Sequence, residues 1–197
     1  MHYFDPNFLI TTLGLAGVFA VIFAESGILL GLFFPGDSLL FIAGVFAAQG
    51  YFSIWVLILG AIVAAVLGDN VGYWFGKKAG PKIFSQEESF FFKKSYVKKT
   101  EEFYRKHGKK TIAFARFVPV VRTFAPVMAG VGDMEYEKFL PWNIVGGGSW
   151  VLLFSLGGFL LGRIMPAGEK YLSYITIAIV VLSVLPMAYQ FLKRSRN

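Results

Sequence analysis

The sequence predicts an all-α integral membrane protein: an inverted repeat of a re-entrant helical hairpin plus a transmembrane helix, with an additional C-terminal transmembrane helix. Three observations predict it, namely an apolar composition, breaks inside apolar segments, and a short internal repeat. Hydrophobic residues make up 56% of the 197 residues and charged residues only 16%. A soluble domain carries about 25% charged residues, and a core of this size could not hide so much apolar surface from water. The composition therefore excludes both a soluble globule and a disordered chain.

The whole chain, residues 1–197, is predicted to form a single membrane domain built from successive apolar segments. These lie at about 8–34, 38–48, 51–76, 111–131, 139–162 and 172–192. Segments 51–76 and 139–162 are long enough to cross a bilayer. Segment 172–192 carries no charge over its 21 residues, and a basic tail follows it. That pattern predicts the C-terminal transmembrane helix.

Segments 25–48 and 111–131 are each interrupted, which predicts two re-entrant hairpins. A helix breaker and charged residues stand within each: Pro35, Gly36 and Asp37 in the first, and Arg116, Pro119 and Arg122 in the second. Lipid cannot satisfy the backbone of a broken helix, so such breaks occur where protein or a water-filled cavity surrounds them. We therefore expect each hairpin to enter the membrane and to leave it on the same side.

The two halves of the chain, 8–76 and 111–162, resemble each other at a shift of 86 residues. Phe41–Val45 recurs as Val127–Val131. Glycines match at the same shift: Gly60 with Gly146 and Gly76 with Gly162. Because each half holds one hairpin and one crossing, the second copy should lie upside down relative to the first. Inverted repeats with broken helices are typical of secondary transporters.

The net charge of +7 is concentrated in residues 77–110, which hold eleven lysines and arginines and four glutamates. A basic loop between apolar segments is the positive-inside signature, so we expect this loop and the basic C-terminus to be cytoplasmic. Residues 93–110 mix lysines with aromatic residues, which is typical of an amphipathic helix on anionic lipid; a solvated connecting helix fits as well. Nucleic-acid binding is disfavoured, because no other element could enter a groove.

Catalytic and metal chemistry find little support in the residue types present. The chain has no cysteine and only two histidines, which excludes thiol catalysis, disulfides and His/Cys metal sites. No Gly-x-Ser-x-Gly motif and no pair of intramembrane-protease aspartates occurs. We therefore expect no catalytic residues, no metal and no cofactor, and we expect that the protein is not an enzyme.

Charged residues fall inside the apolar segments: Glu25, Asp37, Asp69, Arg116 and Arg122. A charge at the bilayer centre costs at least about 2.5 kcal/mol, so these groups need compensation. Pure structural pairing between the acids and the arginines is one interpretation. We favour a functional polar site in which such pairing is the resting state. Asp69 is weaker support, since it could simply bond to Tyr73 or Asn70.

The arginines indicate an anion as the ligand of this site. Arg116 and Arg122 flank Pro119 and converge if the chain turns there, and guanidinium groups match phosphate oxygens bidentately. A helix beginning near Pro119 would add free backbone N–H groups. A phosphate that competes for an arginine would free a carboxylate, Glu25 or Asp37, to take up a proton.

The residues so far resemble the DedA family, the bacterial branch of the SNARE-associated or VTT-domain membrane proteins. The resemblance covers about residues 17–165. It rests on the following motifs: Glu25 with Phe34-Pro35-Gly36-Asp37-Ser38-Leu39-Leu40; Gly68-Asp69-x-x-Gly72-Tyr73-x-x-Gly76-Lys77; and Ala115-Arg116-Phe117-Val118-Pro119-x-x-Arg122. The third motif often begins Gly-Arg-Phe in the family, whereas Ala115 precedes Arg116 here.

The resemblance implies two facing re-entrant hairpins in the bacterial inner membrane. It also implies functional roles for the intramembrane acids and arginines, which here are Glu25, Asp37, Arg116 and Arg122. Members of the family are associated with the return of undecaprenyl phosphate across the membrane, in dependence on the proton motive force. Eukaryotic relatives scramble phospholipids.

We therefore expect a multi-pass protein of the bacterial cytoplasmic (inner) membrane that acts as a lipid flippase for undecaprenyl phosphate. Arg116 and Arg122 would bind the phosphate, while Glu25 and Asp37 would couple protons and gate the hairpins. The supporting residues are Asp69, Tyr73, Pro35, Gly36 and Pro119. The expected partners are a polyprenyl phosphate or phospholipid and protons, with no nucleic acid.

Other functions stay open at this point. They are a general phospholipid scramblase, a proton-coupled exporter of small cations or drugs, and a membrane organiser that transports nothing. The sequence leaves the lipid head group, the direction of transport and the oligomeric state open, and it is compatible with a homo-oligomer.

Overall fold

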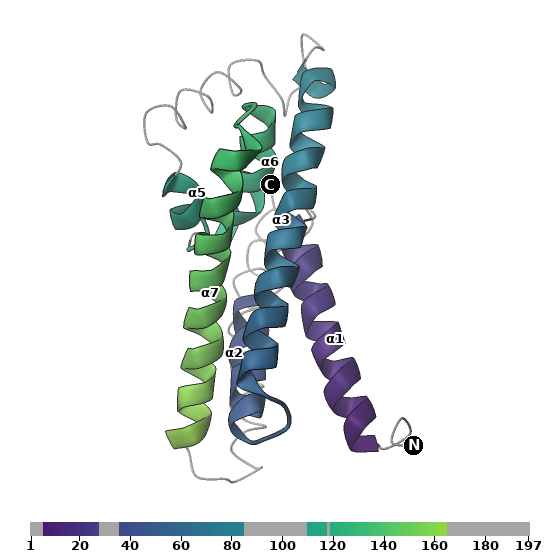
Figure 1. Cartoon of the computed structure of the whole chain (residues 1–197), viewed down its shortest axis with the longest axis vertical. Coiled ribbons are helices and arrows are strands. Elements are labelled where there is room, and N and C mark those ends of the chain that lie inside the picture. The colour runs from purple at the N-terminus through teal and green to yellow at the C-terminus, as the bar shows by residue number, and fades with distance from the viewer. Residues whose placement is uncertain (1–5, 28–35, 85–109, 118, 165–197) are drawn as a thin grey trace, which may run out of the picture. The chain divides into compact units, whose positions relative to one another are not determined.

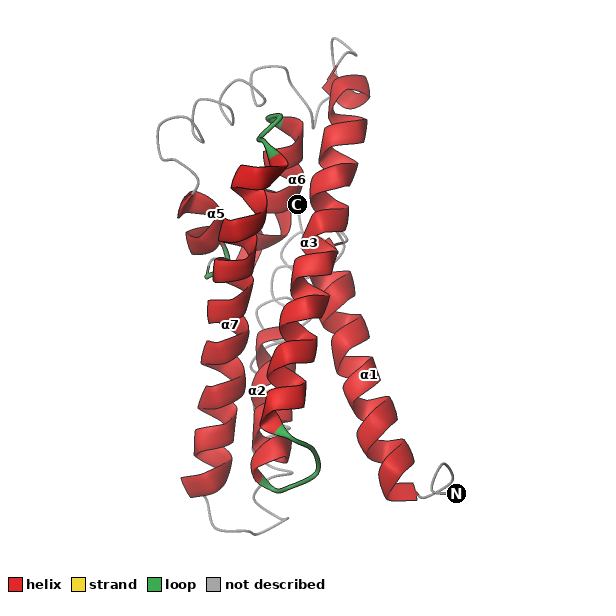
Figure 2. Cartoon of the chain, viewed as in Figure 1, coloured by secondary structure: helices red, strands yellow, loops and turns green. Residues whose placement is uncertain are grey.

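The computed structural model describes residues 6–27, 36–84, 110–117 and 119–164, and within these ranges it is helical with short connecting turns (Figure 2). The helices follow one another along the chain (Figure 1): α1 (Pro6–Gly27), α2 (Gly36–Ala48), α3 (Ile54–Phe84), α5 (Lys110–Ala115), α6 (Pro119–Val131) and α7 (Tyr136–Ile164). The prediction of an all-α protein is confirmed for this part of the chain.

Two of the helices are long and apolar enough to cross a membrane. They cover Ile54–Ala79 of α3 and Tyr136–Ile164 of α7, and an 18-residue segment within each has a mean hydropathy of 2.1 and 1.8 respectively. At 1.5 Å per residue, even the shorter stretch extends about 39 Å, which exceeds the roughly 30 Å hydrocarbon core. Both coincide with the predicted crossings.

Helix α3 continues past Gly76 to Phe84 and therefore enters the segment predicted as a basic loop. Lysine and alanine favour helices, so Lys77, Lys78 and Ala79 extend the span without a break. The predicted amphipathic helix over 93–110 lies outside the described residues, apart from Lys110 at the start of α5. The predicted transmembrane helix over 172–192 also lies outside them.

The second predicted hairpin is a helix–turn–helix. Helix α5 ends at Ala115, and α6 begins at Pro119. Proline suits the first helical position, because its fixed φ is helical and its missing N–H has no partner there. In the first predicted hairpin, α1 ends at Gly27 and α2 begins at Gly36. Pro35 lies outside the described residues.

The chain divides into two compact units, to which α1, α3 and α7 each contribute a part. Unit 1 consists of residues 1–18, 33–60 and 151–197, and unit 2 consists of 19–32 and 61–150. In unit 1, α2 packs against the second half of α7 with backbone touching backbone. A Cβ atom at Gly44 would collide with the carbonyl oxygen of Ser155, and one at Gly158 would collide with that of Phe41.

In unit 2, α6 packs in the same way against the second half of α3. A Cβ atom at Gly130 would collide with the carbonyl oxygen of Tyr73, and one at Gly76 would collide with that of Val127. Small residues allow this approach, and close van der Waals packing is what holds helices together in lipid. Gly44 and Gly130 stand 86 residues apart, so the repeat seen in the sequence is also a repeat of helix contacts.

Candidate functional site

Unit 2 buries four charged side chains that come from four different segments. Glu25 lies on α1, Asp69 on α3, Arg116 in the turn after α5, and Arg122 on α6. They are exposed by only 2%, 1%, 4% and 8% respectively. Arg122 pairs with Glu25, and Arg116 pairs with Asp69. Two cations and two anions balance, so this four-charge cluster has no net charge.

A close contact between α1 and α3 brings the two acids to the same level. A Cβ atom at Gly27 would lie 2.8 Å from the carbonyl oxygen of Gly68, and a Cβ atom at Gly68 would meet the Ser26 side chain at 2.8 Å. Only glycine allows the two backbones to come so near. Because Glu25 and Asp69 directly neighbour this contact in sequence, their carboxylates face the arginines from adjoining helices.

Arg116 has two further partners besides Asp69. Its Nη1 lies 3.4 Å from the Ser26 hydroxyl oxygen, and its Nη2 donates to Oδ1 of Asn143 on α7 at 3.3 Å. The Asn143 amide in turn donates to the carbonyl oxygen of Val66 at 3.4 Å. Helix α7 makes room for the arginine at Gly146, where a Cβ atom would lie 3.2 Å from the Arg116 Cγ. The guanidinium is therefore held by α1, α3 and α7 together.

The two guanidinium groups share one aromatic ring. The Cζ atoms of Arg116 and Arg122 lie 5.8 and 5.0 Å from the ring centroid of Trp150, which is itself buried. Tryptophan is the best partner for a cation over a ring face, and the attraction grows when the pair is removed from water. Trp150 thus keeps two like charges close together, where one multiply charged anion could meet both.

Two supporting residues predicted from the sequence, Asp69 and Tyr73, lie in unit 2 and have different roles. Asp69, predicted to bond to Tyr73 or Asn70 or to support the site, pairs with Arg116. The Tyr73 hydroxyl donates to the carbonyl oxygen of Met134, and its ring stacks on Phe139 at 4.7 Å, so Tyr73 packs the connection between α6 and α7.

The remaining residues of that set fall elsewhere. Gly36 and Asp37 begin α2, which belongs to unit 1. Pro119 supplies the first residue of α6. Among the described residues, no group of three or more His, Cys, Asp or Glu is placed to hold a metal ion.

Three residues of the four-charge cluster's surroundings, Ser26, Asn143 and Trp150, were not predicted from the sequence. Ser26 and Asn143 are polar residues in apolar segments, and a polar group inside the membrane is itself a signal of function or pairing. Asn143, within a predicted crossing, could have been found in this way. Trp150 gave no such signal, because it is one aromatic residue among many in this chain.

Comparison with known proteins places the chain in a family. Residues 34–160 match the VTT domain. Protein DedA of Escherichia coli K12 is 41% identical over 181 residues, which cover 91% of this chain and 82% of that protein. The "Uncharacterized membrane protein Rv0364" of Mycobacterium tuberculosis H37Rv is 42% identical over 188 residues, or 94% and 82% of the two chains.

A more distant relative carries a location in its name. The "Inner membrane protein YqjA" of Escherichia coli K12 is 31% identical over 172 residues, which cover 87% of this chain and 78% of that protein. No solved structure matches the chain. The domain match extends over most of the chain and includes Asp69, Arg116 and Arg122 of the cluster. The chain is a membrane protein that belongs to the DedA family of VTT-domain proteins.

Proposed function

We propose that this protein carries a phosphate-bearing lipid across the bacterial inner membrane, and that the four-charge cluster is its phosphate site in the resting state. The observation that carries the proposal is the pair of buried arginines over one indole ring, each matched by a carboxylate. Guanidinium groups bind phosphate oxygens through paired, charge-assisted hydrogen bonds. When no phosphate is bound, the two carboxylates form ion pairs with the two arginines.

Charge balance then couples transport to protons. The cluster is neutral at rest, so a phosphate monoester that displaces the carboxylates brings up to two extra negative charges into a buried site. An isolated charge of this kind is expensive away from water. Protonation of Glu25 and Asp69 restores neutrality, which makes proton uptake the natural partner of phosphate entry. Asp37, in the first turn of α2, is proposed as a further proton-handling residue.

The substrate, the hairpins and the membrane orientation predicted from the sequence are part of the same proposal. Undecaprenyl phosphate is the proposed substrate, with its prenyl chain in the bilayer. The segments 25–48 and 111–131 are proposed to be re-entrant hairpins that move as the lipid crosses. The loop over 77–110 and the C-terminus are proposed to be cytoplasmic. The chemistry is transport, with no catalytic residue.

The test is the surface accessibility of undecaprenyl phosphate in liposomes that contain the purified protein, with and without a pH gradient. Arg116→Lys and Arg122→Lys keep the positive charge but lose the two parallel N–H donors with which a guanidinium group binds a phosphate. Charge-assisted hydrogen bonds contribute about 1.5–3 kcal/mol, so each variant should slow transport about tenfold or more. Arg163→Lys is the matched control, because Arg163 is exposed and stacks over Phe159 at 4.9 Å in unit 1.

Different results would point to different functions. Wild-type rates in both arginine variants, from folded protein, would contradict the phosphate site and favour a cation exporter in which the acids bind substrate. Movement of glycerophospholipids at equal rates, without any gradient, would identify a general scramblase. Absence of lipid movement under every gradient would leave a membrane organiser.

A further inference from the structure

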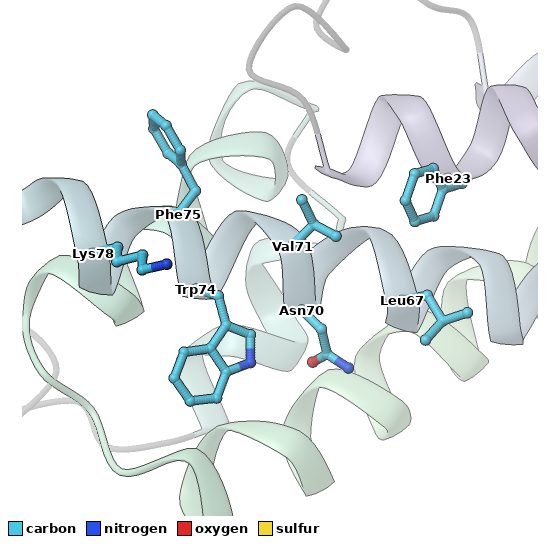
Figure 3. Close-up of a pocket in the computed structure, with 7 residues that line it drawn as sticks. All are labelled: Phe23, Leu67, Asn70, Val71, Trp74, Phe75 and Lys78. Atoms are coloured by element: carbon cyan, nitrogen blue, oxygen red, sulfur yellow. The ribbon is translucent and has the colours of Figure 1, made fainter.

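A groove outside the four-charge cluster runs along the exposed face of α3 in unit 2. Its volume is about 540 Å³. Figure 3 shows side chains from two helices around it: Phe23 from α1, and Leu67, Val71, Trp74 and Phe75 from α3. The α3 residues recur at intervals of three and four, so they form one stripe on that helix. Asn70 and Lys78 complete the lining.

The stripe is apolar and open along most of its length. Leu67, Val71, Trp74 and Phe75 are each about half exposed, at 51%, 49%, 52% and 52%. In a membrane helix, such a face meets lipid chains. A hollow between Phe23 and this face can hold a chain against two helices, which a flat surface cannot do.

A cation, Lys78, borders the apolar groove where the apolar part of α3 ends. Lys77 and Lys78 are the first charged residues of α3 after Asp69. The stretch from Ile54 to Lys77 extends about 36 Å, more than the roughly 30 Å hydrocarbon core, which puts Lys78 at the level where head groups begin. In Figure 3 its ammonium group lies along α3 toward Trp74, as expected for a helical side chain that points back to the N-terminus. Tryptophan and lysine are typical of this interfacial level.

Lys78 and its neighbour differ in their partners. Lys77 forms an ion pair with Asp133 at 3.1 Å. Lys78 forms no ion pair with any other residue that the structure describes. The groove thus combines three features along α3: a cation that lacks a partner in the described part of the chain, then an interfacial aromatic ring, then an apolar channel. A lipid presents its phosphate, its backbone and its acyl chain in the same order.

We infer that this groove binds an anionic phospholipid, with the phosphate on Lys78 and one acyl chain along Trp74, Val71 and Leu67. The occupant is a lipid of the bilayer leaflet at the Lys78 end of α3, held independently of transport at the buried arginines. Anionic lipid is favoured over zwitterionic lipid, because a single lysine near the membrane surface attracts net negative charge.

Quenching of Trp74 fluorescence by brominated lipids measures the occupancy of the groove. The protein is reconstituted with phosphatidylglycerol or phosphatidylcholine that carries bromine on an acyl chain. The Trp74 signal is the difference between the protein and its Trp74→Phe variant. We expect the brominated phosphatidylglycerol to quench at lower lipid fractions than the phosphatidylcholine.

Lys78→Gln should reduce that preference about fivefold, the effect of one lysine near an anionic surface. Lys77→Gln is the matched control: it removes the same charge one residue away, but from a lysine already paired with Asp133, so the preference should persist. Val71→Phe fills part of the groove without a change in charge and without a new fluorescent side chain, and it should weaken quenching of Trp74 by both lipids.

Three results would overturn the inference. The first is equal quenching by the two lipids in the unmodified protein. The second is an equal loss of preference in Lys77→Gln and Lys78→Gln, which would indicate diffuse surface charge. The third is unchanged quenching of Trp74 in Val71→Phe. None of these results bears on the arginine variants in the flipping assay, so the groove and the proposed function fail separately.

Discussion

The two units use the same helix contact but differ in what they bury beside it. In unit 1, α2 meets α7 at Gly44 and Gly158; in unit 2, α6 meets α3 at Gly130 and Gly76. At the repeat's shift of 86 residues, Asp69 of unit 2 corresponds to Ser155 of unit 1. Asp69 pairs with Arg116, whereas the buried Ser155 hydroxyl has no hydrogen-bond partner within the described residues.

The same contrast continues one and two turns further along the helix. Tyr73 donates a hydrogen bond to the Met134 carbonyl oxygen, while its counterpart Phe159 has no hydroxyl to donate. Lys77 pairs with Asp133, while its counterpart Arg163 stacks over Phe159. Both units therefore share the close helix contact, and at these positions unit 2 makes the two ion pairs and the hydrogen bond described above.

The largest loss of stability is expected when the charge of Asp69, the position that distinguishes the two units, is removed. Asp69→Ala leaves Arg116 buried with its carboxylate partner lost, and breaking a buried pair costs about 3–5 kcal/mol. Thermal unfolding in detergent should show a large loss of stability. The double variant Asp69→Leu with Arg116→Met removes both charges and should recover most of it. A double variant as unstable as Asp69→Ala would mean that packing, and not charge, dominates at this position.

A second prediction concerns the close helix contact at glycine that the two units share. Gly44→Ala and Gly130→Ala each place a Cβ atom against the backbone of the neighbouring helix, and overpacking of this kind costs about 1–3 kcal/mol. Both should destabilise the protein to a similar extent. Gly14→Ala is the control, since a Cβ atom there meets nothing within 4 Å and alanine favours a helix. A loss confined to one of the two variants would break the equivalence of the units.

A third, smaller effect should come from the ring that the arginines share. Trp150→Leu removes an attraction of about 0.5–2 kcal/mol for each cation, whereas Trp150→Phe keeps a ring of weaker attraction. We expect transport of undecaprenyl phosphate to fall further in Trp150→Leu than in Trp150→Phe. Equal rates in the two variants would show that Trp150 acts only by filling space.

The smallest change in stability should come from substitution of Ser155. Ser155→Ala removes a buried hydroxyl that has no hydrogen-bond partner in the described part of the chain, and an unsatisfied polar group costs about 1–3 kcal/mol when buried. The variant should therefore be as stable as the unmodified protein or slightly more so in the same unfolding measurement. A clear loss of stability would show that Ser155 has a polar partner and that unit 1 is less apolar than its described contacts indicate.

The sequence by itself determined the helical class of the described residues, the two helices long enough to cross a membrane, and the break between α5 and α6. These follow from local physics: apolar stretches of sufficient length, and a proline that starts a helix but cannot continue one. It also identified Glu25, Asp69, Arg116 and Arg122 as charged residues in apolar segments, because such charges are expensive wherever they occur in the chain.

Only the tertiary structure decided which of these charges meet. Asp69 of α3 meets Arg116, which follows α5, and Gly146 of α7 leaves the space for the arginine. Asn143 and Trp150 also join the cluster from a helix distant in sequence. Contacts between distant helices depend on the depth and rotation of each helix against its neighbours, which the local pattern of residues does not encode.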